Sequence, residues 1–297
     1  MSLSRPGGVI AAIPTPVSGL EPDLDRFVAL AQKLLATGCD GLNVLGTTGE
    51  ATSFSLEQRL RVMEATAQAG LPMGRLMVGT GAAAVGDAVA LTREAAALGF
   101  GGALVLPPFY YKNVPADGIV RYIDAIVAAT KESALPIYLY NFPAQSGVAY
   151  DIALIKRLID GFGSRIAGLK DSSGDLAYAR EAAAIAPGFD VFPSTEAALG
   201  EARDGPFAGC ISATANVNAQ WCAKALHDRD DAALATAVKI RALFDGKPLV
   251  PGVKALVARL HGDPALAGLM PPFSPLDDKT TDDILAAFQT IAGAAGG

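Results

Sequence analysis

One lysine in the sequence occupies a position suited to covalent chemistry. Lys170 ends the apolar segment 166–169 and is followed at once by Asp171, two serines and a glycine. A lysine at the mouth of a buried strand can attack a carbonyl carbon and form an imine, because desolvation lowers the pKa of a lysine amine and leaves it uncharged. Neighbouring hydroxyl groups can then carry protons to and from the intermediate. The alternative is a strand-end lysine paired with Asp171, and spacing alone favours neither reading.

Most other apolar segments also end in polar residues, and many of these carry hydroxyl groups. They are Thr15, Gly46–Glu50, Thr80, Tyr110, Tyr111, Tyr140, Asn141, Ser194–Glu196, Thr214 and Asn216. The set contains no histidine and no group of three metal ligands, which indicates chemistry without a metal ion. We therefore expect no metal and no cofactor beyond the lysine itself.

The segment "LGTTGEA" (45–51) is a glycine-flanked turn that leads into a helical region. Its backbone N–H groups and the hydroxyls of Thr47 and Thr48 are suited to holding a carboxylate, with Gly46 and Gly49 on either side. The alternative is an ordinary turn in which the threonines cap the backbone. For Tyr140, at the end of the fifth apolar segment, a place in the core is the commoner case by pattern alone.

Eight short apolar segments alternate with helical patterns and must position these residues. They cover 8–13, 41–45, 75–79, 102–106, 136–140, 166–170, 190–194 and 209–213. Continuous apolar runs of this length are typical of strands buried on both faces. The alternation predicts a (β/α)8 TIM barrel over residues 1–217. An open doubly wound sheet is less favoured, because no GxGxxG follows the first strand.

Three further helical stretches follow the eighth strand, at 218–245, 253–261 and 281–292. They predict a helical extension over residues 218–297 that packs on the barrel and forms a single structural unit with it. We find no low-complexity linker that would separate a second domain.

Composition narrows the class of protein. The 297 residues are 51% hydrophobic and 18% charged, which excludes a disordered chain. The formal net charge is -6 and no basic cluster occurs, so nucleic acid is not an expected partner. We see no signal peptide or bilayer-spanning segment, and the three cysteines form no CxxC pair. These features predict a cytoplasmic enzyme that acts on small-molecule substrates.

Taken together, the motifs resemble the dihydrodipicolinate synthase and N-acetylneuraminate lyase superfamily of pyruvate-dependent class I aldolases. The resemblance runs through nearly the whole chain in order, in "AAIPTP", "GTTGEA", "PPFYY", "YNFPAQSG", "GLKDSSGDL", "GCISATANV" and "PGVKALVARL". It implies a TIM barrel, an imine mechanism without a metal ion, and a homotetramer built from two tight dimers.

The resemblance also implies roles for individual residues. Lys170 matches the lysine that forms a Schiff base with pyruvate, and Tyr140 matches the proton-relay tyrosine. Thr47 and Thr48 match the pair that binds the pyruvate carboxylate and joins the relay. Tyr110 matches a tyrosine that extends across the tight-dimer interface into the active site of the neighbouring subunit, and Tyr111 is the alternative for this role. Ile211 matches a residue near the bound pyruvate.

One departure from the pattern bears on the substrate. Dihydrodipicolinate synthases carry an arginine two residues before the glycine of "YNxPxxxG", where this chain has Gln145. Glutamine cannot form the bidentate charged pair that arginine forms with a carboxylate. We therefore expect an acceptor other than aspartate semialdehyde, such as the aldehyde of a 2-keto-3-deoxy sugar acid, with Gln145 and Glu196 binding its hydroxyl groups.

Other functions use the same residues. A genuine 4-hydroxy-tetrahydrodipicolinate synthase and a Schiff-base dehydratase would both need Lys170 and Tyr140. A barrel that binds a keto acid without catalysis is a third alternative, but it would have no need to keep the lysine, the tyrosine and the threonines together.

Overall fold

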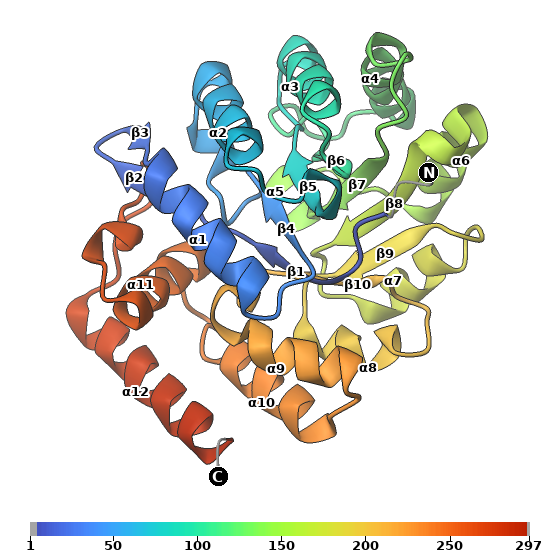
Figure 1. The fold of residues 1–297 in the computed structure, drawn as a ribbon. Helices are drawn as coiled ribbons and strands as arrows, with labels where there is room; N and C mark the ends of the chain where they lie inside the picture. The colour runs from blue at the N-terminus through green and yellow to red at the C-terminus, as the bar shows by residue number, and fades with distance from the viewer. Residues whose placement is uncertain (1–4, 296–297) are drawn as a thin grey trace.

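Eight parallel strands form a nearly closed ring in the computed structural model, which describes residues 5–295 (Figure 1). The strands are β1 (Gly8–Ala12), β4 (Gly41–Val44), β5 (Leu76–Gly79), β6 (Gly102–Val105), β7 (Ile137–Asn141), β8 (Ile166–Asp171), β9 (Asp190–Pro193) and β10 (Gly209–Ser212). Their order is β10-β1-β4-β5-β6-β7-β8-β9, and the Ala208 N–H donates to the Val191 carbonyl at 3.0 Å where β9 meets β10. The predicted (β/α)8 barrel is confirmed, and each strand coincides with a predicted apolar segment.

A helix follows each barrel strand and covers the outside of the ring. These helices are α1 (Leu24–Ala36), α2 (Leu56–Gln68), α3 (Val85–Ala97), α4 (Ala116–Ala129), α6 (Ile152–Phe162), α7 (Leu176–Ala183), α8 (Leu199–Ala202) and α9 (Ala215–His227). Local sequence explains where several begin: Asp23 and Asp151 cap α1 and α6, and Ser55 with Gln58 forms a capping box on α2. Shorter elements lie in the loops: the hairpin of β2 (Val17–Ser18) and β3 (Glu21–Pro22), and α5 (Pro143–Ser146).

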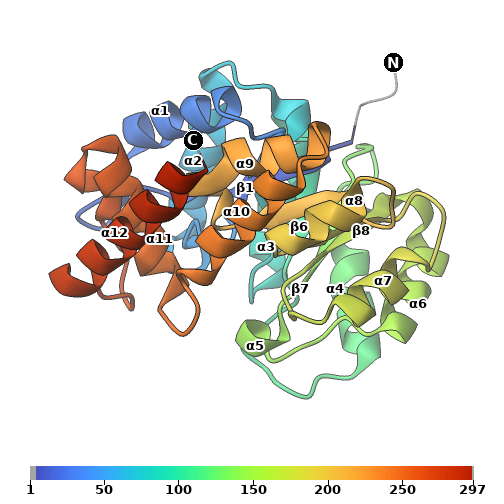
Figure 2. The same cartoon turned by 90° about the horizontal axis from the view of Figure 1, so that it is seen from below.

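The C-terminal helices gather on one side of the barrel, beside α1 and α9 (Figures 1 and 2). They are α10 (Asp231–Ala242), α11 (Leu249–His261) and α12 (Asp278–Ala294). Within residues 5–295 no helix is both long and apolar enough to cross a bilayer.

The structure corrects one helix of the sequence prediction. The stretch 218–245 is not continuous: α9 ends at His227, and α10 begins after the Asp230 cap. Arg229 adopts a left-handed backbone conformation between them, with φ 57°. Helix α9 follows β10 as the eighth helix of the ring, and the proposed boundary at residue 217 lies inside it.

The barrel interior is filled by side chains from all parts of the ring. Tyr138 on β7 lies between Gly102 on β6 and Gly168 on β8, where a Cβ atom would approach its ring to 2.6 and 2.8 Å. The tyrosine ring therefore requires glycine on both neighbouring strands. Two positions further along the same strands, toward their carboxyl ends, Tyr140 pairs in register with Lys170.

Candidate active site

Lys170 lies inside the barrel, at the penultimate position of β8. Its register partners are Tyr140 on β7 and Phe192 on β9, and both of these side chains belong to the interior cluster. Lys170 is 4% exposed, and its Nζ lies 4.3 Å from the centre of the Tyr140 ring. The Lys170 amine thus lies among apolar and aromatic side chains at the carboxyl end of the strands.

Asp171 faces the opposite side of the strand, as successive strand residues must. Its carboxylate accepts from Asn141 Nδ2 at 2.8 Å and from the Ser173 hydroxyl at 2.8 Å. Burial raises the pKa of Asp171, and these two hydrogen bonds oppose the shift. No ion pair joins Lys170 to Asp171 in the described part of the chain. The geometry therefore lacks the pairing that a structural strand-end lysine would require.

The tyrosine whose ring packs against Lys170 Nζ pairs its hydroxyl with that of a threonine. Tyr140 Oη and Thr47 Oγ1 are 3.0 Å apart, which is a hydrogen bond in which either group can donate. Tyr140 is 4% exposed, and Thr48, next to Thr47, is buried as well. Lys170, Tyr140 and Thr47 are far apart in sequence, and the barrel brings them together. This arrangement can move a proton between the tyrosine and the threonine next to an amine.

The turn after β4 is held in a strained shape. Leu45 and Glu50 both adopt left-handed conformations, with φ 53° and 55°, which is uncommon for residues other than glycine. Across residues 5–295 the backbone N–H groups of Thr47 and Thr48 have no hydrogen-bond partner. Consecutive free N–H groups in a turn form an anion-binding concavity. This geometry suits the predicted carboxylate site.

A close backbone approach fixes the position of the turn. A Cβ atom at Gly79 would lie 2.0 Å from the carbonyl oxygen of Leu45, so only glycine fits at the end of β5. The Thr15 hydroxyl also donates to the carbonyl oxygen of Gly49 at 2.9 Å. The turn is thereby held against the ends of β1 and β5.

A buried ion pair ties the same turn to the C-terminal helices. The Glu50 carboxylate pairs with the Lys254 ammonium of α11, and it also accepts the backbone N–H of Met270 at 2.7 Å. Lys254 Nζ donates in addition to the Thr15 carbonyl at 2.9 Å. Burial lowers the pKa of Lys254, and the neighbouring Glu50 opposes the shift. Lys254 is a functional residue that the sequence motifs do not mark, and its one signal is a lysine inside the apolar pattern "GVKALVA".

Glu196 lies in a network of its own. Its Oε1 accepts hydrogen bonds from Ser212 at 2.8 Å, from Asn218 at 3.2 Å and from the Thr214 hydroxyl. The residue is fully buried, and no hydrogen bond joins it to Lys170 or Tyr140 within residues 5–295. The predicted neighbour Ile211, in contrast, belongs to the interior cluster around Tyr140.

The remaining predicted residues lie on exposed segments. Tyr110 and Tyr111 are 75% and 73% exposed and pack edge to face with ring centres 5.3 Å apart. Gln145 is exposed on α5. Lys112 Nζ donates to the Ser146 carbonyl at 2.8 Å and so holds the tyrosine loop against α5. Within a single chain, neither exposed tyrosine joins the hydroxyl pair of Thr47 and Tyr140.

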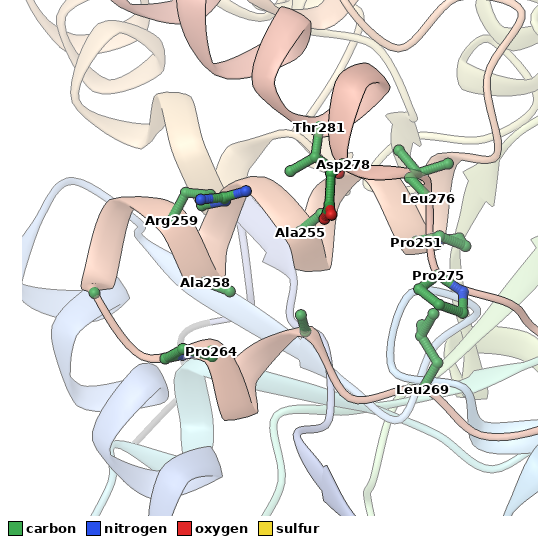
Figure 3. A pocket seen from close by; sticks show the side chains of 12 residues that line it. Pro251, Ala255, Ala258, Arg259, Pro264, Leu269, Pro275, Leu276, Asp278 and Thr281 are labelled. Atoms are coloured by element: carbon green, nitrogen blue, oxygen red, sulfur yellow. The ribbon is translucent and has the colours of Figure 1, made fainter.

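Two cavities differ in their relation to these residues. A small one of about 30 Å³ is lined by Gly46, Thr47, Leu104 and Tyr140, among others. Figure 3 shows a cavity of about 530 Å³ between α11 and the start of α12, lined mainly by apolar side chains. None of the predicted site residues lines the second cavity.

Comparisons with known proteins agree with this geometry. A family model described as the dihydrodipicolinate synthetase family matches residues 5–291. An uncharacterised DapA-like lyase from Chloroflexus aurantiacus is 32% identical over 298 residues, covering 97% of this chain and 98% of that protein.

Two solved structures are similar along their full lengths. One is YagE, an E. coli K12 prophage protein of the dihydrodipicolinic acid synthase family in complex with pyruvate. Its TM-score is 0.87 at 27% identity, covering 96% of this chain and 98% of that chain. The other is dihydrodipicolinate synthase from Agrobacterium tumefaciens, with a TM-score of 0.89 at 27% identity, covering 96% and 99%.

Proposed function

The chain belongs to the dihydrodipicolinate synthetase family, and from that premise we propose that it is a pyruvate-dependent class I lyase acting through an imine on Lys170. The observation that carries the proposal is the position of Lys170 Nζ inside the barrel, 4.3 Å from the Tyr140 ring centre. The Tyr140 hydroxyl lies 3.0 Å from Thr47 Oγ1 and supplies the proton relay that imine chemistry needs. The similar E. coli structure in complex with pyruvate supports the choice of 2-oxo acid.

The proposed reaction begins with attack of the Lys170 amine on C2 of a 2-oxo acid. Tyr140 gives its phenolic proton to the departing hydroxyl, so the carbinolamine loses water and leaves a protonated imine and a tyrosinate, while the N–H groups of Thr47 and Thr48 hold the carboxylate. In the cleavage direction the Tyr140 tyrosinate takes the proton of the C4 hydroxyl, the C3–C4 bond breaks, and the imine accepts the electron pair as an enamine. An aldehyde leaves. Protonation of the enamine and hydrolysis of the imine then release pyruvate and restore Lys170.

For the acceptor we propose a neutral polyol aldehyde, as in 2-keto-3-deoxy sugar acids. Gln145 on α5 offers hydrogen bonds without the charge that a second carboxylate would require. The Glu196 carboxylate already accepts three hydrogen bonds from its own chain, so the proposal rests on Gln145 and not on Glu196. The second candidate is 4-hydroxy-tetrahydrodipicolinate synthase activity, favoured by the similarity to the Agrobacterium synthase.

An acceptor screen tests the proposal. The protein is incubated with a panel of 2-keto-3-deoxy sugar acids, and released pyruvate is followed by coupled reduction to lactate. We expect pyruvate release, and a kcat/KM for condensation with sugar aldehydes at least about tenfold above that with aspartate semialdehyde. Preference for aspartate semialdehyde would identify a synthase. Loss of water without pyruvate release would identify a dehydratase, and imine formation without turnover would identify a binding protein.

The Tyr140→Phe variant is expected to lower kcat by about 10²–10⁴-fold, because it removes the proton relay while keeping the ring that packs beside Lys170. Imine formation should persist at a reduced rate. Pre-steady-state trapping with borohydride separates the two steps. An unchanged kcat would show that another group carries the proton, and Thr47→Val is the matched variant that removes the partner hydroxyl.

We also propose that the chain acts as a tetramer of two tight dimers, without a metal or other cofactor. The exposed aromatic pair of Tyr110 and Tyr111 supports a subunit contact at this loop, since large exposed aromatic side chains are enriched at interfaces. Tyr110 would then reach the relay of the neighbouring subunit.

A further inference from the structure

Asn43 is a buried polar side chain without a partner. It is 0% exposed, and within residues 5–295 neither its Nδ2 nor its Oδ1 takes part in a hydrogen bond. Leaving a buried amide unpaired is costly, and buried polar groups in native proteins are nearly always satisfied. The side chain therefore requires an explanation outside the contacts of the chain itself.

Strand register places Asn43 inside the barrel. It is the penultimate residue of β4, and its register partners are Ala12 on β1 and Met77 on β5, both in the interior cluster. Strands β4 and β8 are four positions apart in the ring of eight, so they face each other across the barrel. Lys170 is likewise the penultimate residue of its strand. Asn43 and Lys170 thus occupy the same end of the interior from opposite walls.

The amide lies directly under the carboxylate-binding turn. A Cβ atom added to Gly46 would come within 2.4 Å of Asn43 Nδ2, so the nitrogen lies against the backbone that leads into Thr47. The N–H groups of Thr47 and Thr48 also lack partners in the described chain. Three donor groups therefore stand at one end of the barrel without an acceptor.

We propose that Asn43 binds the substrate, and that its Nδ2 donates a hydrogen bond to the carboxylate of the bound 2-oxo acid together with Thr47 and Thr48. This inference rests on the proposed function, because the carboxylate is that of the acid which forms the imine on Lys170. A carboxylate has enough lone pairs to satisfy all three donors. Gly46 is required at its position because any side chain there would displace the amide.

The test compares Asn43→Leu with the wild-type protein. Leucine has a similar size but no polar atoms. The pyruvate concentration that half-saturates borohydride trapping is expected to rise about tenfold, from the loss of one hydrogen bond to a charged group. The melting temperature without pyruvate should stay the same or rise, because an unpaired buried amide has been removed.

A second variant and a matched control complete the design. Asn43→Asp keeps the shape but repels a carboxylate, so its half-saturating pyruvate concentration should rise further. Thr92→Val removes a buried hydroxyl that does have partners, the Ala88 carbonyl at 2.7 Å and the Thr80 hydroxyl at 2.9 Å. It should lower the melting temperature and leave pyruvate binding unchanged.

The outcomes separate this inference from the proposed function. A wild-type half-saturation in both Asn43 variants would overturn the role of Asn43 while leaving the imine mechanism intact. A wild-type protein that gives no adduct on Lys170 at any pyruvate concentration would overturn the proposed function itself.

Discussion

Lys170→Met is expected to abolish covalent capture of pyruvate and to lower kcat/KM by at least about 10⁴-fold, the scale on which loss of a nucleophile acts in an enzyme. Methionine keeps the unbranched stem and carries no amine. In the described chain the lysine side chain makes no hydrogen bond or ion pair, so its replacement leaves no partner unsatisfied. The fold and the melting temperature should therefore be retained. Intact mass after borohydride reduction, with peptide mapping, measures the loss.

The second buried lysine provides an internal control for this experiment. Lys254 Nζ is engaged by Glu50 and by the Thr15 carbonyl, so it is not available for attack on a carbonyl group. In the wild-type protein the reduced adduct should map to Lys170 and not to Lys254. An adduct that survives in Lys170→Met, or one that maps elsewhere, would show that the lysine is not the nucleophile.

The barrel could be predicted from sequence because its strands are buried on both faces. Such strands read as continuous apolar runs, and "GLNVL" and "GALVL" stand out between helices that begin at clear caps. The break between α9 and α10 was missed for the opposite reason. The left-handed residue there is Arg229, so the turn lacks the glycine that commonly marks a helix end. Asp230, which caps α10, was the one local sign.

The predicted start of a helix was also wrong in the C-terminal extension. Helix α11 begins at Leu249, four residues before the predicted start, with Pro251 in its first turn. Proline is tolerated there, since the first N–H groups of a helix have no partner inside the helix.

Site residues could be predicted from sequence only where a chemically reactive side chain follows directly after an apolar strand segment. Lys170, Tyr140 and Thr47 each follow an apolar run, and a parallel barrel must bring such ends to one face. Asn43 and Lys254 gave weaker signals, each a polar residue within an apolar pattern. What they face depends on register across the ring and on where the C-terminal helices pack. The sequence of one chain also cannot say that the Glu196 carboxylate is bound by Ser212 and Asn218.

Lys254→Met is expected to destabilise the protein by about 3–5 kcal/mol, because it leaves the Glu50 carboxylate buried without its counter-charge. The free energy of unfolding from urea titration measures the change. The substitution should also disturb the active site, since Glu50 is the last residue of the turn that contains Thr47 and Thr48. We expect weaker capture of pyruvate in this variant even though Lys170 is unchanged.

A double variant tests whether the stability lost in Lys254→Met comes from leaving the buried Glu50 charge without its partner. Glu50→Gln with Lys254→Met removes both charges, so it should recover part of the stability lost in Lys254→Met, because no uncompensated ion remains inside the protein. The glutamine side-chain oxygen can still accept the Met270 N–H, which the wild-type carboxylate accepts at 2.7 Å, and so keep the turn in place. A double variant as unstable as the sum of the two single variants would mean that the two side chains act independently. The ion pair would then not be what couples the C-terminal helices to the turn.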